Sequence, residues 1–89
     1  MERELTILNK LGLHARPASE FVRCARKFKS TVLIRKDGEE YSAASILDVL
    51  AANLDCGSRM IVEADGPDAN DALEQLADLL VQFTRQEEE

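Results

Sequence analysis

The chain has 89 residues, of which 45% are hydrophobic, and a formal net charge of −6 at pH 7. This length fits one globular domain over residues 1–89, and the acidic balance argues against non-specific binding to nucleic acid. The N-terminus lacks the apolar segment of a signal peptide, and no apolar run is long enough to cross a membrane. We therefore expect a cytoplasmic protein that does not insert into membranes.

The first elements are a strand and an amphipathic helix. Leu5 and Ile7 alternate with polar residues, which predicts a strand over residues 3–8. Proline is favoured at the first position of a helix, so Pro17 predicts a helix that begins near Arg16 or Pro17. Apolar residues then follow at spacings of three and four, at Ala18, Phe21, Val22, Ala25 and Phe28.

A hairpin follows this helix. Residues 31–36 are rich in β-branched side chains, which favours a strand, and Asp37-Gly38 is a strong signal for a tight turn. Residues 39–43 then form a short and polar return strand, which is typical of the edge of a sheet.

The second half of the chain predicts two further helices and a strand. Ser45 is a suitable N-cap for a helix over residues 46–54, with Gly57 as its stop. A strand over residues 60–64 and a helix over residues 68–85 complete the order β-α-β-β-α-β-α. We predict an α+β fold, in which the first and last helices cover one face of a four-stranded antiparallel sheet and Thr6, Arg35 and Glu63 lie on the open face.

The segment Gly12-Leu13-His14-Ala15-Arg16-Pro17-Ala18 contains the only histidine of the chain. At a helix N-terminus the positive end of the helix dipole favours an uncharged imidazole, which can attack a phosphoryl group directly. Free backbone N–H groups and the guanidinium of Arg16 can then bind the phosphoryl oxygens, and Gly12 leaves room for a partner. The ordinary alternative is a surface histidine in a loop. One histidine and two widely spaced cysteines do not make a usual metal site.

This segment resembles the active-site signature of the HPr family, the phosphocarriers of the bacterial phosphoenolpyruvate-dependent phosphotransferase system. The Asp37-Gly38 turn, Ser45 and Gly57 also fall where that family has them. The resemblance implies an open-faced β-sandwich that is a carrier rather than an enzyme, works as a monomer and needs neither a metal nor a cofactor. It implies that His14 accepts a phosphoryl group on Nδ1 from phospho-enzyme I and donates it to enzyme IIA proteins for sugar uptake, with Arg16 stabilising the phosphate.

The same resemblance implies a docking surface and a regulatory site. The docking residues are Ser19, Arg23, Ile46, Leu47, Leu50 and Ala51; we expect Leu47 to be exposed and Val49 to lie in the core. Ser45 aligns with a serine that an HPr kinase/phosphorylase modifies in some members, but Asp48 places a negative charge on the docking face that is unusual for such members. Two alternatives stay open, namely a carrier of the nitrogen-linked phosphotransferase chain and a regulatory binding protein that acts through its phosphorylation state.

Overall fold

The computed structural model describes the backbone of residues 1–88 and the side chains of residues 1–86. It contains seven helices and strands in the predicted order: β1 (Glu2–Thr6), α1 (Ala15–Arg26), β2 (Thr31–Lys36), β3 (Glu39–Ser42), α2 (Ile46–Ala51), β4 (Arg59–Asp65) and α3 (Ala69–Glu88). The four strands form one antiparallel sheet in the order β1-β4-β2-β3, so the short polar strand β3 lies at an edge as predicted.

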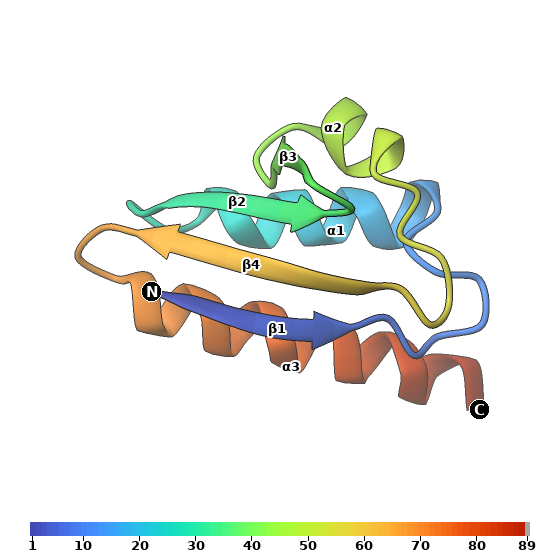
Figure 1. Cartoon of the computed structure of the whole chain (residues 1–89). Coiled ribbons are helices and arrows are strands. Elements are labelled where there is room, and N and C mark those ends of the chain that lie inside the picture. The colour runs from blue at the N-terminus through green and yellow to red at the C-terminus, as the bar shows by residue number, and fades with distance from the viewer. Residues whose placement is uncertain (89) are drawn as a thin grey trace.

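The helices cover one face of the sheet, which confirms the predicted α+β fold. Helices α1 and α3 lie side by side behind the strands, and the shorter α2 lies beside α1 near β3 (Figure 1). On the opposite face, Arg35 of β2 forms ion pairs with Glu63 of β4, at 2.9 Å, and with Glu2 of β1. These pairs connect three strands across the face that is open to solvent.

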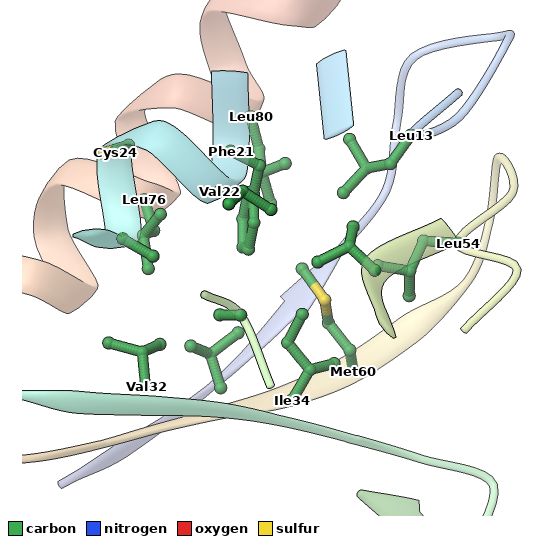
Figure 2. Packing of buried hydrophobic residues seen from close by; sticks show 14 of the residues in the cluster. Leu13, Phe21, Val22, Cys24, Val32, Ile34, Leu54, Met60, Leu76 and Leu80 are labelled. Atoms are coloured by element: carbon green, nitrogen blue, oxygen red, sulfur yellow. The ribbon is translucent and has the colours of Figure 1, made fainter. Parts of the chain in front are cut away.

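The hydrophobic core fills the space between the sheet and the helices. Alternate residues of β2 and β4 point into it, among them Val32, Ile34, Met60 and Val62. The stripe on α1 packs against them through Phe21, and Figure 2 shows the same cluster continuing to Leu76 and Leu80 of α3 and to Leu13 and Leu54 in the loops. The core therefore reaches the loop that carries the histidine.

Helix α1 begins earlier than the sequence predicts. Its first intrahelical hydrogen bond runs from the N–H of Ala18 to the carbonyl oxygen of His14, at 2.8 Å, so His14 is the N-cap and Pro17 the third residue of the helix. The first N–H groups of any helix lack an intrahelical acceptor, so a proline at the third position loses no hydrogen bond. The prediction of Pro17 at the first position was wrong by two residues, and the correction places His14 directly at the end of the helix.

Helix α2 is shorter than predicted and ends at Ala51 instead of Leu54. Asn53 has a left-handed backbone, with φ 50°, which stops the helix before Gly57 is reached. The Lys36 ammonium donates hydrogen bonds to the carbonyl oxygens of Ala52 and Asn53, at 2.9 and 2.7 Å, and so satisfies acceptors at this helix end.

The remaining boundaries differ by one to three residues, which is the usual uncertainty at element ends. Strand β1 ends at Thr6, where residue 8 was predicted, β3 ends at Ser42, and β4 is one residue longer at each end. Helix α3 begins one residue later than predicted and continues to Glu88.

Candidate functional site

The loop before α1 is tied to the segment that follows α2. The N–H of Ile7 donates to the carbonyl oxygen of Ser58 at 2.9 Å, and the N–H of Gly57 donates to the carbonyl oxygen of Ile7 at 2.7 Å. At the other end of the loop, the N–H of Leu13 donates to the carbonyl oxygen of Leu54 at 2.8 Å, and the Leu13 side chain is buried. The position of His14 is therefore fixed by tertiary contacts on the residue just before it.

Gly12 is needed for this attachment, a role that the sequence did not predict, and the room it was expected to leave for a partner stays a prediction. Its backbone is left-handed, with φ 65°, and the residue is buried. A Cβ atom here would lie 2.5 Å from the carbonyl oxygen of Leu54 and 2.8 Å from the Cα of Asp55. Only a glycine allows the two backbone segments to lie this close.

Asn9 is a buried residue of the site that the sequence analysis did not single out. Its side chain is 2% exposed. Its side-chain Nδ2 donates to the carbonyl oxygen of Gly12 at 2.7 Å, and its backbone carbonyl oxygen accepts from the N–H of Gly12 at 3.1 Å. Asparagine commonly closes a turn in this way, so an Asn three residues before a Gly was a usable signal.

His14 lies at the solvent-exposed end of α1. The residue is exposed, has an extended backbone and uses no side-chain atom to cap the helix. Its Nδ1 lies 3.3 Å from the carbonyl oxygen of Gly12. Among the side chains of residues 1–86 and the backbone of residues 1–88, the N–H groups of Ala15 and Arg16 find no acceptor and the Arg16 guanidinium forms no ion pair. The exposed end of α1 thus brings together an imidazole, two backbone donors and a guanidinium.

The imidazole opens into a shallow hollow of about 300 Å³ that also includes part of α3. The hollow is lined by Asn9, Leu11, His14, Arg16, Pro17, Glu20, Phe83 and Gln86. The sequence did not predict Phe83 and Gln86 here, because no local pattern shows that the end of α3 lies beside a residue about 70 positions earlier. Glu20 lies on α1 and was not expected to line the hollow. Glu20 adds an acidic residue to the lining of the hollow that contains His14 and Arg16.

Two of the predicted docking residues on α1 lie together with one on α2. A groove of about 320 Å³ is lined by Ser19, Val22, Arg23, Arg26 and Ile46. Arg26 is partly engaged, because its Nε donates to the carbonyl oxygen of Ala44 at 2.9 Å and so ties α1 to the loop before α2. Arg23 makes no hydrogen bond or ion pair with the described residues and is exposed.

The predicted docking residues of α2 form an apolar surface. Leu47 is 75% exposed, Ile46 and Leu50 are a little over one-third exposed, and Ala51 is exposed. Val49 points the other way and is fully buried, as predicted. A helix of six residues that exposes three large aliphatic side chains is unusual for a surface with no partner.

The Ser45 hydroxyl caps α2, as predicted, by accepting a hydrogen bond from the N–H of Asp48 at 3.3 Å. The expected position of Asp48 was wrong. Its carboxylate turns away from the exposed leucines and accepts a hydrogen bond from the N–H of Ser42 at 2.9 Å, at the end of β3. This carboxylate therefore secures the connection from β3 to α2.

The two cysteines differ in environment and neither forms a disulfide. Cys24 is buried between α1 and α3, and this burial raises the pKa of its thiol, with Lys27 opposing the shift. Cys56 is exposed. Within the described residues, no three His, Cys, Asp or Glu side chains are grouped to hold a metal ion. None of the helices in this part of the chain has the length and apolar character needed to cross a membrane.

Comparison with known proteins places this geometry in a family. The family described as the PTS HPr component phosphorylation site matches residues 1–82. The phosphocarrier protein HPr of Cupriavidus necator is 38% identical over 80 residues, which cover 90% of each chain. The HPr-like protein Crh of Bacillus subtilis is 36% identical over 77 residues, which cover 86% of this chain and 91% of Crh.

Solved structures give the same result. The crystal structure of an HPr from Thermoanaerobacter tengcongensis superimposes with a TM-score of 0.90 at 36% identity and covers 94% of both chains. A crystal structure of Bacillus subtilis Crh matches with a TM-score of 0.74 and 34% identity over 91% of this chain, and that protein is described as a swapped dimer.

Proposed function

Because this chain belongs to the HPr family of phosphocarriers of the phosphotransferase system, we propose that His14 is its phosphoryl acceptor and donor. The observation that carries this proposal is the exposed His14 ring at the N-terminus of α1, beside two unused backbone N–H groups and the unpaired Arg16 guanidinium. Residues 1–89 act as one carrier domain that is loaded and unloaded in turn and carries out no reaction on a substrate of its own.

In the loading step, Nδ1 of the uncharged imidazole attacks the phosphorus atom of phospho-enzyme I. A new bond from Nδ1 to phosphorus forms as the bond from the donor nitrogen to phosphorus breaks, and the donor group leaves with that electron pair. The N–H groups of Ala15 and Arg16 bind phosphoryl oxygens at the positive end of the helix dipole. The Arg16 guanidinium adds two parallel donors to the dianion.

The hollow around the ring also contains a group that opposes phosphorylation. Glu20, an acidic residue, is among the residues that line it, with His14 and Arg16. A second negative charge raises the free energy of the phosphorylated state, which makes the phosphoryl group easier to pass on. We expect Glu20 to favour transfer from His14 to an enzyme IIA protein over storage on His14.

The partners dock on the surface formed by α1 and α2. Ser19, Arg23 and Ile46 line one groove, and Leu47, Leu50 and Ala51 extend the apolar area beside it. An exposed guanidinium beside aliphatic side chains fits a partner with an apolar patch rimmed by carboxylates. The small size of this area suits the short-lived contacts that a shuttle makes with enzyme I and with enzyme IIA proteins.

The direct test is incubation with enzyme I and phosphoenolpyruvate, followed by mass spectrometry and peptide mapping. The expected result is one acid-labile phosphoryl group on His14, none on His14→Ala and full loading of Ser45→Ala. Arg16→Lys keeps the charge but loses the fork of donors, so we expect slower loading than in the matched control Arg59→Lys. Arg59 is exposed on β4 and lines neither the hollow nor the docking groove. Loading of His14→Ala would refute the proposed acceptor.

The same assay separates the alternatives. Loading by sugar-type enzyme I supports a role in sugar uptake, and loading only by a nitrogen-type enzyme I would assign the chain to the nitrogen-linked system. A regulatory binding protein would keep its partner affinity and its biological role in His14→Ala, whereas a carrier loses phosphate uptake and transport. Size-exclusion chromatography with light scattering tests the proposed monomer.

We also propose Ser45 as the acceptor of a regulatory phosphate from an HPr kinase/phosphorylase. The added dianion would lie at the N-terminus of α2, directly beside the exposed Leu47 and the rest of the docking surface, and would hinder docking of enzyme I. Incubation with the kinase and ATP is expected to label the wild-type protein but not Ser45→Ala. An absence of label on Ser45 would exclude this regulation.

A further inference from the structure

Among the described residues, Asn9 and Ser30 are the two buried polar side chains, and only one of them is fully satisfied. The Ser30 hydroxyl donates to the Asp68 carboxylate at 2.5 Å. The Nδ2 of Asn9 donates to Gly12, but the buried Oδ1 of Asn9 accepts no hydrogen bond. An unsatisfied buried oxygen is costly. There is a second reason for an asparagine here, besides closing the turn.

The other end of the Asn9 hydrogen bond supplies that reason. The carbonyl oxygen of Gly12 faces both the Nδ2 of Asn9, at 2.7 Å, and the Nδ1 of His14, at 3.3 Å. A carbonyl oxygen has two lone pairs and can accept from both donors. Because it can only accept, an Nδ1 that is hydrogen-bonded to it carries the proton, and the lone pair of the uncharged ring is then on Nε2.

We infer that Asn9 is a positioning residue that holds the Gly12 carbonyl against His14 and thereby keeps the resting imidazole in its Nδ1–H tautomer. We call this arrangement of Asn9, Gly12 and His14 the resting latch. The latch deepens the function proposed above and rests on it, because Nδ1 is the atom that must be free to attack. Phosphorylation then requires the ring to leave the Gly12 carbonyl and its proton to move to Nε2.

The latch lowers the reactivity of an exposed nucleophile towards phosphoryl donors that do not dock on the protein, by about two- to threefold. Asn9 is 2% exposed, and its Nδ2 holds the carbonyl oxygen of Gly12 while its backbone carbonyl oxygen accepts from the N–H of Gly12, so the Gly12 carbonyl is held in place on both sides of the residue. The distance of 3.3 Å marks the hydrogen bond to His14 as weak. A weak bond biases the tautomer without preventing a docked partner from turning the ring towards the N–H groups of α1.

The test compares Asn9→Leu, which keeps the shape but removes the donor, with Ser30→Ala as a matched control. Ser30→Ala removes a buried hydrogen bond just before β2, beyond the C-terminal end of α1, whereas His14 caps the N-terminal end of that helix. The ¹⁵N chemical shifts of the uncharged ring report the ratio of the Nδ1–H to the Nε2–H tautomer. We expect this ratio to fall about two- to threefold in Asn9→Leu, which is the value of one weak hydrogen bond, and to stay unchanged in Ser30→Ala.

A second measurement uses phosphoramidate, a small phosphoryl donor that needs no enzyme I. Nδ1 attacks its phosphorus atom, the bond from phosphorus to nitrogen breaks, and ammonia leaves with the electron pair. We expect Asn9→Leu to be phosphorylated on Nδ1 about two- to threefold faster than wild type, because Nδ1 carries no proton in a larger fraction of its uncharged rings. Asn9→Ala serves as the second variant if the leucine does not fold.

An unchanged tautomer ratio in a folded Asn9 variant overturns the latch, whatever enzyme I does. A fall of the ratio in Ser30→Ala equal to that in the Asn9 variant also overturns it, because the effect would then follow from lost stability. Failure of enzyme I to load the wild-type protein overturns the proposed function but leaves the tautomer result intact. The two proposals are therefore tested separately.

Discussion

Replacement of Gly12 by alanine tests the contact that holds the histidine loop in place. The backbone of Gly12 is left-handed, which costs an L-residue roughly 1 kcal/mol. The new Cβ would lie 2.5 Å from the carbonyl oxygen of Leu54, which belongs to the backbone and cannot turn aside as a side chain can. Overpacking of this kind costs about 1–3 kcal/mol. We expect Gly12→Ala to lower the free energy of unfolding by about 2–4 kcal/mol in all.

Gly38→Ala provides a control for the backbone conformation alone. Gly38 is also left-handed, with φ 79°, but a Cβ there would meet no atom within 4 Å. Its replacement should therefore cost only about 1 kcal/mol. The difference between the two variants isolates the contact of Gly12 with the residues 54–55.

The assay is urea denaturation of both variants, followed by circular dichroism, together with their melting temperatures. One kcal/mol moves the melting temperature of a domain of this size by about 4–8 °C, so Gly12→Ala should melt at least about 4 °C below Gly38→Ala. We also expect slower loading of His14 by enzyme I in Gly12→Ala, because the displaced loop carries the ring. Equal destabilisation of the two variants would refute the claim that the loop is fixed by this close approach.

Three further predictions concern other parts of the fold. Ser45→Ala should lower the free energy of unfolding by about 1 kcal/mol in urea denaturation, because it removes the N-cap of α2. The Ser30 hydroxyl holds the pKa of Asp68 below its usual range. The stability that this carboxylate contributes is therefore present above its pKa in the unfolded chain and is lost as the pH falls through its lower pKa in the folded protein. Asp68→Asn should flatten the acid side of a plot of the free energy of unfolding against pH. Alkylation at neutral pH should modify the exposed Cys56 quickly and Cys24 slowly, since burial raises the pKa of Cys24, and equal rates in the native protein would contradict this placement.

Sequence patterns were sufficient to predict the elements and their order, because each depends on residues that are neighbours along the chain. Phe21 and Val22 lie three or four positions from other apolar residues, and this spacing predicted the buried face of α1. The pair Asp37-Gly38 predicted the hairpin. The boundaries were less certain. Helix α2 ends at Ala51 because Asn53 adopts a left-handed backbone, and nothing local distinguishes this asparagine from one that continues the helix.

The candidate site was predicted only in part for the same reason. His14 and Arg16 belong to one short segment, so their association with a helix N-terminus could be read from the sequence. Glu20 follows one turn later on the same helix and was missed because its carboxylate was not expected in the hollow. Phe83 and Gln86 reach the hollow only through the packing of α3 beside α1.

The sequence by itself determined that this chain makes a β-α-β-β-α-β-α domain and that its single histidine lies at the start of a helix, since hydrophobic spacing and turn residues act over a few positions. Only the tertiary structure decided what holds that histidine. Gly12 packs against residues 54–55, and Asn9 is buried beside Gly12, where its amide reaches the carbonyl that faces the ring. Asn9, Gly12 and His14 are near neighbours along the chain, but the contact of Gly12 with residues 54–55 joins segments some 40 residues apart. That contact follows from the packing of the whole core and not from any local pattern.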